Sequence, residues 1–214
     1  MNLKHYYWYF KGSLSPKFCD EVIKKGLATK AQRATTGTES DKLKKKKRLS
    51  TQDIKQLKKV RNSNLVFLSE EWLYRVIAGY AGMASRGAGW NFQYDYTESP
   101  QFTIYKKNHH YTWHMDAFQD PYKFDHKWEH YRNKIRKLSL VAQLTDPKEF
   151  EGGELQFDYR NSNDGSPAIA TCEGFNNTRG SVIVFPSFVY HRIKPLLKGT
   201  RYSLVAWILG NPYV

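Results

Sequence analysis

The sequence contains little cysteine and no long hydrophobic run. Its two cysteines, Cys19 and Cys172, are too few for a disulfide framework or for a zinc site made of cysteine thiolates. No apolar stretch approaches the ~20 residues that a membrane-spanning helix needs. The N-terminal stretch MNLKHYYWYFKGS also lacks the apolar region and small-residue cleavage site of a signal peptide. These absences predict a cytoplasmic protein without a membrane partner.

Acidic residues are also scarce. The 20 Asp and Glu residues stand against 34 Lys and Arg residues, so the formal net charge is +14. The excess is local, because the segment from Lys42 to Arg61 contains ten basic residues and a single acid, Asp53. A charge excess confined to one segment does not predict a basic face, so we do not expect a nucleic-acid partner. The segment is interpreted either as a solvated loop or as a loop that binds substrate.

Three helices and one strand are expected before residue 100. The aromatic run at 6–10 predicts a short strand. A Ser-Pro pair followed by apolar residues at helical spacing predicts a helix over 16–27. Residues 28–50 are nearly free of apolar side chains and predict a mobile loop, followed by a short basic helix over 51–59. Ser69 is expected to cap a third helix. The buried stripe of that helix should consist of Trp72, Leu73, Val76, Ile77, Tyr80 and Met83.

From Gln101 onward the pattern changes to short β-rich runs, many of them alternating between apolar and polar side chains. Gly, Pro, Asn and Asp residues separate the runs. Strands at this spacing indicate a sandwich or jelly roll and not a parallel sheet with crossover helices. A chain of 214 residues has the size of one domain. The expected fold class is therefore mainly β with flanking helices.

A candidate metal site is present in the run His114-Met115-Asp116, which falls in a predicted strand. Residues i and i+2 of a strand point to the same face, so the imidazole and the carboxylate should project together while Met115 packs on the other side. Two histidines and one carboxylate form the facial triad that leaves iron positions open for oxygen chemistry. His191, just after the apolar strand SVIVFPSFVY, qualifies as the third ligand.

A candidate carboxylate-binding site follows His191. A hairpin turn would bring Arg201 near His191, and Arg201, Ser203, Val205 and Trp207 share one strand face by the period of two. A guanidinium beside a hydroxyl is suited to holding a carboxylate in bidentate geometry. A dicarboxylate such as 2-oxoglutarate could therefore bind iron through its keto-acid end and Arg201 and Ser203 through its far carboxylate.

These patterns resemble the 2-oxoglutarate/Fe(II) dioxygenases, and specifically their prolyl-hydroxylase branch. The resemblance covers residues 101–209. An H-x-D pair alone is a weak signal, but the same pair with a distant histidine and a following R-x-S is strong. The residues that match the family pattern are Tyr105, Tyr111, His114, Asp116, Asp146, Pro147, Gly152, Gly153, Glu154, Leu155, Phe185, Pro186, His191, Gly199, Arg201, Ser203 and Trp207.

The resemblance implies a double-stranded β-helix (jelly roll) core over 101–209, supported by N-terminal helices, with a mobile basic loop at about 28–60. It implies Fe(II) as the metal, 2-oxoglutarate as co-substrate and O2 as oxidant, with decarboxylation to succinate and hydroxylation of the substrate. Tyr105 and Gln143 are expected to contact the co-substrate together with Arg201 and Ser203. The expected substrate contacts are Arg61, Tyr111 and Trp207, although Tyr111 and Trp207 could equally serve in packing.

A second metal pattern is rejected. Residues 126–130, HKWEH, match the H-x-x-E-H pattern of a class of zinc proteases. Their surroundings, KFDHKWEHYRNKIRK, predict a short, charged and solvated helix with hardly any apolar stripe. A catalytic metal needs ligands that are buried and held by neighbouring groups. The pattern is therefore interpreted as coincidental.

The sequence thus predicts one domain over 1–214 that hydroxylates a prolyl residue of a protein or peptide, using Fe(II), 2-oxoglutarate and O2. Two alternatives stay open. One is a hydroxylase of a free amino acid or another small molecule, which a short closed lid would favour. The other is a non-catalytic nucleic-acid-binding protein, which would bind in a salt-sensitive manner and turn over no co-substrate. The target and the oligomeric state are not predicted.

Overall fold

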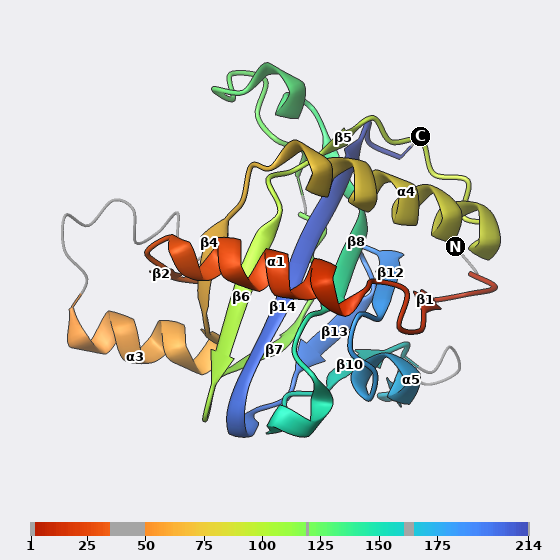
Figure 1. The fold of residues 1–214 in the computed structure, drawn as a ribbon. Coiled ribbons are helices and arrows are strands. Elements are labelled where there is room, and N and C mark those ends of the chain that lie inside the picture. Colours follow the sequence, from red (N-terminus) through yellow and green to blue (C-terminus); the bar gives the residue numbers. More distant parts are fainter. Residues whose placement is uncertain (1–2, 35–49, 119, 161–164, 214) are drawn as a thin grey trace.

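The structure, a computed structural model, describes residues 3–34, 50–118, 120–160 and 165–213 (Figure 1). Within these residues, no helix combines the length and the apolar character needed to cross a membrane. The helices are α1 (Pro16–Ala28), α3 (Thr51–Val60), α4 (Glu71–Ala88) and α5 (Glu173–Asn176), with 3-10 turns at Glu129–Tyr131 and Pro147–Glu149.

Side chains at the helix starts explain why α1 and α3 begin where they do. The Ser15 hydroxyl accepts a hydrogen bond from the backbone N–H of Phe18, and Pro16 occupies the first helical position. Ser50 and Asp53 form a reciprocal capping box at the start of α3. The predicted helices at 16–27 and 51–59 are thereby confirmed within a residue at each end.

The prediction for α4 is partly wrong. Its cap position is Glu70, which makes no side-chain cap, and Ser69 uses its backbone N–H to bond the Glu70 carboxylate. Leu73 and Ile77 are buried as expected, whereas Met83 is 45% exposed. The apolar spacing located the helix correctly, but the stripe that faces the sheet is narrower than the predicted one.

The strands form two antiparallel sheets. The nine-stranded sheet runs β1-β12-β8-β14-β6-β4-β2, with β5 and β9 paired to β14, and the five-stranded sheet runs β11-β10-β13-β7-β3. The strands are β1 (Trp8–Phe10), β2 (Gln32–Arg33), β3 (Arg61–Asn62), β4 (Asn64–Phe67), β5 (Tyr96–Thr97), β6 (Gln101–Lys106), β7 (His110–His114), β8 (Ile135–Gln143), β9 (Phe150–Gly152), β10 (Leu155–Asp158), β11 (Ile169–Thr171), β12 (Val182–Pro186), β13 (Tyr190–Ile193) and β14 (Leu196–Gly210).

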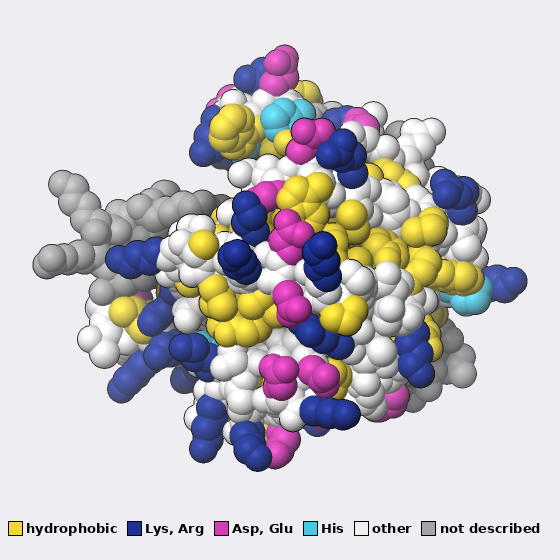
Figure 2. All heavy atoms as spheres, in the orientation of Figure 1, with side chains coloured by type: hydrophobic (Ala, Val, Ile, Leu, Met, Phe, Trp, Pro, Cys, Tyr) yellow, Lys and Arg dark blue, Asp and Glu magenta, His cyan; other side chains and the backbone are white. Residues whose placement is uncertain are grey.

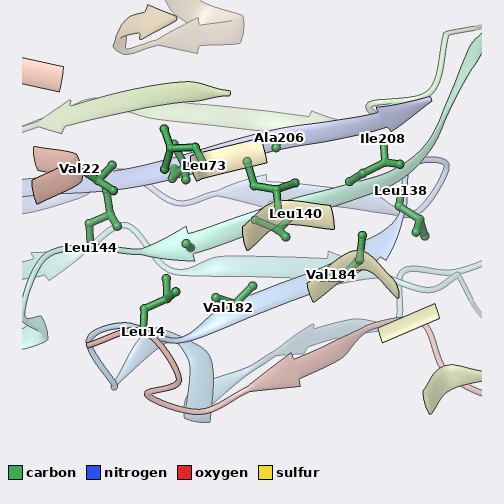
Figure 3. Close-up of a cluster of buried hydrophobic side chains, with 14 of the residues drawn as sticks. Leu14, Val22, Leu73, Leu138, Leu140, Leu144, Val182, Val184, Ala206 and Ile208 are labelled. Atoms are coloured by element: carbon green, nitrogen blue, oxygen red, sulfur yellow. The ribbon is translucent and has the colours of Figure 1, made fainter. Parts of the chain in front are cut away.

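The large sheet separates two hydrophobic layers. Its outer face packs against α1 and α4, and Figure 1 shows α1 crossing in front of β6, β14 and β8. Figure 3 shows Val22 and Leu73 of these helices in the same cluster of buried side chains as Leu140 and Ala206 of the sheet. Its inner face, which consists of the alternate residues of each strand, packs Val141, Ile183 and Phe185 against the small sheet in a second hydrophobic layer. This alternation is the period of two that the sequence shows, and it confirms a mainly β jelly-roll core with flanking helices.

Two predictions for the connecting segments are wrong. Gln32 and Arg33, within the predicted loop at 28–50, form β2 and pair with β4. The remainder of that loop, including Lys44 to Lys47, lies outside the described residues. The segment 123–137 is not a charged helix. Residues 123–134 form a loop with one 3-10 turn at Glu129–Tyr131, closed by backbone hydrogen bonds that join Tyr122 to Asn133 and Lys134, and residues 135–137 begin β8. The helix was predicted from the local pattern of charged residues. The backbone hydrogen bonds to Tyr122, which is outside that pattern, hold the segment as a loop.

Candidate metal and dicarboxylate site

The three predicted metal ligands meet between the two sheets. β7 and β13 pair so that His114 lies directly opposite His191, and Asp116 follows the end of β7. The His114 Nε2 atom is 3.6 Å from one Asp116 carboxylate oxygen, and the His191 Nε2 atom is 3.5 Å from the other. The candidate ligand atoms all lie within 4.8 Å of one another. In the described residues this is the one cluster of histidine, cysteine and acidic side chains with such spacing.

The local reasoning that placed Asp116 needs correction. The strand ends at His114, so Asp116 is not part of it, and Met115 is 44% exposed and packs on no opposite face. The backbone N–H groups of Asp116 and Ala117 instead bond the carbonyl oxygen of Ser187 at 2.9 and 2.8 Å. These bonds turn the chain so that the carboxylate reaches the two imidazoles.

Hydrogen bonds to the backbone set the tautomer of both histidines. The Nδ1 atom of His114 lies 2.8 Å from the carbonyl oxygen of Thr112, and that of His191 lies 2.9 Å from the carbonyl oxygen of Val189. A carbonyl can only accept, so each Nδ1 carries the hydrogen and donates it. Each Nε2 is therefore without a hydrogen and has a lone pair available for a metal, which is the state that a metal-binding imidazole requires.

The charge states of the cluster also suit a cation. Burial would raise the pKa of the Asp116 carboxyl, but the neighbouring His191, His114 and Arg136 outweigh it and hold that pKa well below its usual range. Burial and the nearby His114 lower the pKa of His191 to about 4. At neutral pH the site therefore contains an ionised Asp116 carboxylate beside a neutral His191 imidazole. Two histidines and one carboxylate form a donor set that fits a divalent metal.

A buried serine pair orients the carboxylate, and sequence reasoning missed it. The Ser139 hydroxyl donates to Asp116 at 2.7 Å and lies 2.9 Å from the Ser187 hydroxyl. Ser139 is on β8 and faces the inner layer because its neighbours Leu138 and Leu140 face the helices. A serine within the apolar run KLSLVAQL was the available signal.

Arg201 lies at the other end of the same inner face. β14 pairs with β6 so that Arg201 lies opposite Tyr105, and it does not form a hairpin with β13, which belongs to the small sheet. The predicted hairpin with His191 is therefore wrong, because the chain crosses from one sheet to the other between the two residues. Both residues nevertheless face the interior between the sheets.

The Arg201 guanidinium is buried, and its terminal nitrogens have no hydrogen-bond partner among the described residues. The side chain is only 1% exposed. Burial lowers the pKa of Arg201 to about 10 against the opposing effects of Tyr105 and Glu154. A buried, unpaired cation is costly, so the site calls for an anion with two oxygens to bridge the nitrogens.

Other polar groups adjoin this cation. Ser203, next to Arg201 on the same face, lies opposite Gln143 on β8. The Gln143 side chain is fully buried, and neither its oxygen nor its nitrogen has a partner among the described residues. Burial raises the pKa of Tyr105, so its phenol keeps its proton and can donate it. The predicted co-substrate residues Arg201, Ser203, Gln143 and Tyr105 are thus brought together on adjacent strands.

One cavity joins the two ends of the site. Its lining includes the three candidate ligands together with Tyr105 and Ser203, and Val141, Leu155, Ile193 and Val205 supply apolar walls. Arg201 and Gln143 lie behind this lining, adjacent in register to Tyr105 and Ser203. The cavity therefore connects the three candidate metal ligands with Tyr105 and Ser203, the neighbours of Arg201 and Gln143.

The predicted substrate residues also border the cavity. Tyr111 stacks on the His114 ring with centroids 3.4 Å apart, and the Arg61 guanidinium lies 4.7 Å from the Tyr111 centroid. β3 pairs with β7 so that Arg61 is opposite Tyr111, and the Nε of Arg61 donates to the Ser63 hydroxyl. Trp207 presents an indole N–H that has no acceptor in the described regions. The structure places all three at the cavity, and their contact with a substrate stays a prediction.

A buried ion pair near the cavity was not anticipated. Arg136 donates two hydrogen bonds to the Glu98 carboxylate, at 2.6 and 2.7 Å. Its guanidinium lies between the rings of Trp207 and Phe118, at 3.8 and 4.6 Å from their centroids. The Tyr122 hydroxyl also donates to Glu98. The pair anchors the segment after Asp116 to β8, and residues this far apart in sequence give no local signal of their contact.

The rejected H-x-x-E-H pattern forms no metal cluster within the described ranges. The His126 ring bonds the backbone at Trp128, and the His130 ring packs against Tyr96 with centroids 4.1 Å apart. These histidines serve the loop and not the cavity.

The chain is similar to several known proteins. The sequence pattern of the 2OG-Fe(II) oxygenase superfamily matches residues 100–209. A PKHD-type hydroxylase of Xylella fastidiosa is 32% identical over 117 residues, which make up 52% of this chain and 44% of that protein. A PKHD-type hydroxylase of Pseudoalteromonas atlantica is 31% identical over 113 residues, which make up 51% of this chain and 42% of that protein. The chain thus spans less than half the length of these curated relatives.

Solved structures share the fold at low sequence identity. One is a prolyl hydroxylase from Trichoplax adhaerens in complex with a hypoxia inducible factor oxygen degradation domain peptide fragment. Its TM-score is 0.65 at 13% sequence identity, and the matched region covers 96% of this chain and 84% of that chain. A Pseudomonas putida prolyl-4-hydroxylase gives 0.58 at 15% identity, with 96% and 92% covered. The donor set of the triad and the unpartnered Arg201 fit the iron and the dicarboxylate that the superfamily name specifies. Because the family pattern matches more than half of its residues, this chain belongs to the 2OG-Fe(II) oxygenase superfamily.

Proposed function

We propose that this chain is an Fe(II)- and 2-oxoglutarate-dependent dioxygenase that hydroxylates a prolyl residue of a protein or peptide. The observation that carries the proposal is a cavity with a metal-binding cluster in its lining and a buried cation next to it. His114, Asp116 and His191 line the cavity and can bind a divalent metal. Arg201 lies next to the lining residues Tyr105 and Ser203, and its terminal nitrogens have no hydrogen-bond partner among the described residues. Fe(II) bound by the three ligands would supply the activation of O2 that is coupled to decarboxylation of 2-oxoglutarate.

The remaining residues bind and orient. Arg201 receives the far carboxylate of 2-oxoglutarate in bidentate geometry, and Ser203, Gln143 and Tyr105 supply hydrogen-bonding groups from the adjacent strands. The apolar walls at Val141, Leu155, Ile193 and Val205 limit the access of water to the reacting groups.

The proposed substrate class rests on the cavity border and on the relatives. Tyr111 and Trp207 place aromatic side chains at the cavity border, where they can make apolar contact with a prolyl ring, and Arg61 provides a cation for a substrate carbonyl or carboxylate. The similar sequences are hydroxylases of the PKHD type, and the similar structures are prolyl hydroxylases, one of them holding a peptide. Together these observations favour a proline-containing polypeptide over a free amino acid.

The direct test measures succinate formed from 2-oxoglutarate in the presence of Fe(II) and a panel of proline-containing peptides. Mass spectrometry of each peptide should show one added oxygen, located on proline by fragmentation. Free proline and other amino acids form the parallel arm. Oxygen added only to a free amino acid would contradict the polypeptide substrate, and the absence of iron-dependent succinate in every arm would contradict the enzyme itself.

Replacing Ser139 with alanine is expected to weaken iron binding. The substitution removes the hydroxyl that holds one Asp116 oxygen, and loss of such a supporting bond typically lowers metal affinity by about 10–100-fold. The Fe(II) concentration for half-maximal succinate formation should rise accordingly. Ser187→Ala is the matched control, because it removes the bond between the two serine hydroxyls and leaves the Ser139 bond to Asp116 in place. Equal effects of both variants would mean that Ser139 acts through packing and not through Asp116.

A further inference from the structure

A cluster of lysines lies on α3, at the end of β6 and on the turn that follows β6. We call it the α3 face; its members are Lys55, Lys58, Lys59, Lys106 and Lys107, all exposed. Figure 2 shows Lys and Arg side chains gathered around the position that α3 occupies in Figure 1 and below it, toward the lower tips of the strands. The structure thus brings together basic residues that the sequence separates by more than forty positions.

Backbone contacts hold the two parts of the α3 face together. The His110 ring bonds the carbonyl oxygen of Lys59 at 3.1 Å, and the Thr112 hydroxyl donates to that of Val60 at 3.1 Å. Burial lowers the pKa of His109, and the charges of Lys106 and Lys58 contribute to that shift, so both cations lie near one ring. The lysines of the helix and of the turn therefore form one positive surface.

This positive surface is not neutralised from within. None of its five lysines forms an ion pair inside the ranges that the structure describes, whereas Lys25, Lys194 and Lys198 elsewhere each pair with a glutamate. The single acid of α3, Asp53, lies in the first turn of the helix and caps Ser50. An unpaired set of like charges raises the local potential and attracts a negative partner.

The α3 face is continuous with the cavity border. α3 ends at Val60, and the next residue, Arg61, starts β3 and stacks on Tyr111 at the cavity. A polypeptide whose residue enters the cavity past Arg61 therefore has α3 beside it on that side. The segment 120–134, green at the top of Figure 1, lies at a distance from α3 and offers no equivalent set of lysines.

We propose that the α3 face docks an acidic stretch of the polypeptide substrate, located on one side of the residue that is hydroxylated. This inference rests on the proposed function, since it specifies the substrate of that same cavity. Each exposed ion pair contributes little alone, but several together accelerate association and select for negatively charged partners. The docked stretch then presents the neighbouring residue to the cavity at Arg61.

The composition of the α3 face favours a polypeptide over a nucleic acid. Single-stranded nucleic acids are usually bound by aromatic side chains that stack on the bases. None of the exposed large hydrophobic residues of the described chain belongs to α3 or to the β6–β7 turn.

The test compares two triple variants that lose the same charge. The first is Lys55→Gln, Lys58→Gln and Lys106→Gln, and the control is Lys11→Gln, Lys17→Gln and Lys24→Gln, which changes exposed lysines on α1 and before it. Binding is measured by fluorescence anisotropy of labelled peptides that share one central proline. A run of glutamates precedes the proline in one peptide and follows it in another, and glutamines replace the glutamates in a third.

One glutamate peptide should bind the unaltered protein more tightly than the other two, in a manner that salt weakens. The α3-face variant should lose about tenfold in affinity for that peptide, and the control variant should lose far less. Equal losses in both variants, equal binding of the two glutamate peptides, or no advantage over the glutamine peptide would each overturn the proposal. A DNA or RNA oligonucleotide that displaces the peptide and depends on the same lysines would overturn it in favour of nucleic acid.

The two proposals fail separately. Peptide binding requires no turnover, so one-sided binding without any hydroxylation would contradict the proposed function and leave the docking face standing. Hydroxylation of all three peptides with equal efficiency would support the proposed function and overturn the docking face. Succinate formation without peptide should be unchanged in both triple variants, because none of these lysines lines the cavity.

Discussion

Replacing His114 or His191 with alanine is expected to abolish Fe(II)-dependent turnover and to leave a folded protein. Each substitution removes one of three side chains that converge on the candidate metal position, so the remaining pair cannot hold the metal in a facial arrangement. Succinate formation should fall to the level of the protein without iron. Circular dichroism and urea unfolding should show that both variants retain the fold, because both rings line the cavity, although the His191 ring also packs against Phe185.

A histidine outside the cluster serves as the control. His130→Ala removes a ring from the H-x-x-E-H pattern, where it packs on Tyr96 and belongs to no metal cluster of the described residues. Its turnover should match that of the unaltered protein. Substantial activity in either cluster variant would contradict the triad, and loss of activity in the His130 variant would show that the discarded pattern has a role in the reaction.

The sequence predicted the site well where residue type and strand period determine the geometry. Arg201, Ser203 and Val205 share a face because alternate residues of any strand do, and the structure shows them on the inner face of β14. The same rule failed for Asp116, because a strand period applies only while the strand continues. β7 ends at His114, and bonds to the Ser187 carbonyl, invisible in the local sequence, place the carboxylate instead.

Contacts between sheets could not be predicted from local patterns. His191 and Arg201 are separated by a short turn, which favoured a hairpin, yet β13 and β14 join different sheets. The cavity exists because the two sheets face one another. The sheets are formed by pairing between strands that are far apart in the sequence, such as the strands of His114 and His191. Ser139 and the Arg136–Glu98 pair were missed for the same reason, since each acquires its role from a partner distant in sequence.

Replacing Arg201 with alanine is expected to raise the 2-oxoglutarate requirement by about tenfold or more and to leave iron affinity little changed. A charge-assisted hydrogen bond contributes about 1.5–3 kcal/mol, and about 1.4 kcal/mol corresponds to a factor of ten in binding. The concentration of 2-oxoglutarate for half-maximal succinate formation measures the first effect, and a titration with Fe(II) measures the second. An unchanged 2-oxoglutarate requirement would mean that the far carboxylate binds elsewhere.

Arg192→Ala is the matched control for this substitution. Arg192 is on β13 next to His191, but the alternation of the strand points it away from the cavity, where it bonds Gln156 and stacks on Trp113. Removing this guanidinium takes away the same charge from the same region of the protein. Its 2-oxoglutarate requirement should therefore stay near that of the unaltered protein.

Stability measurements separate a binding role of Arg201 from a structural one. Without 2-oxoglutarate the guanidinium is buried and unpaired, so Arg201→Met, which keeps much of the volume and removes the charge, should unfold at the same or a higher temperature than the unaltered protein. Adding 2-oxoglutarate should then stabilise the unaltered protein, because a ligand stabilises the state that binds it, and should stabilise the variant much less. A variant that is destabilised without 2-oxoglutarate would show that Arg201 supports the fold. If the variant is as stable as the unaltered protein without 2-oxoglutarate and less stable with it, Arg201 is a buried cation whose role is to bind an anionic ligand.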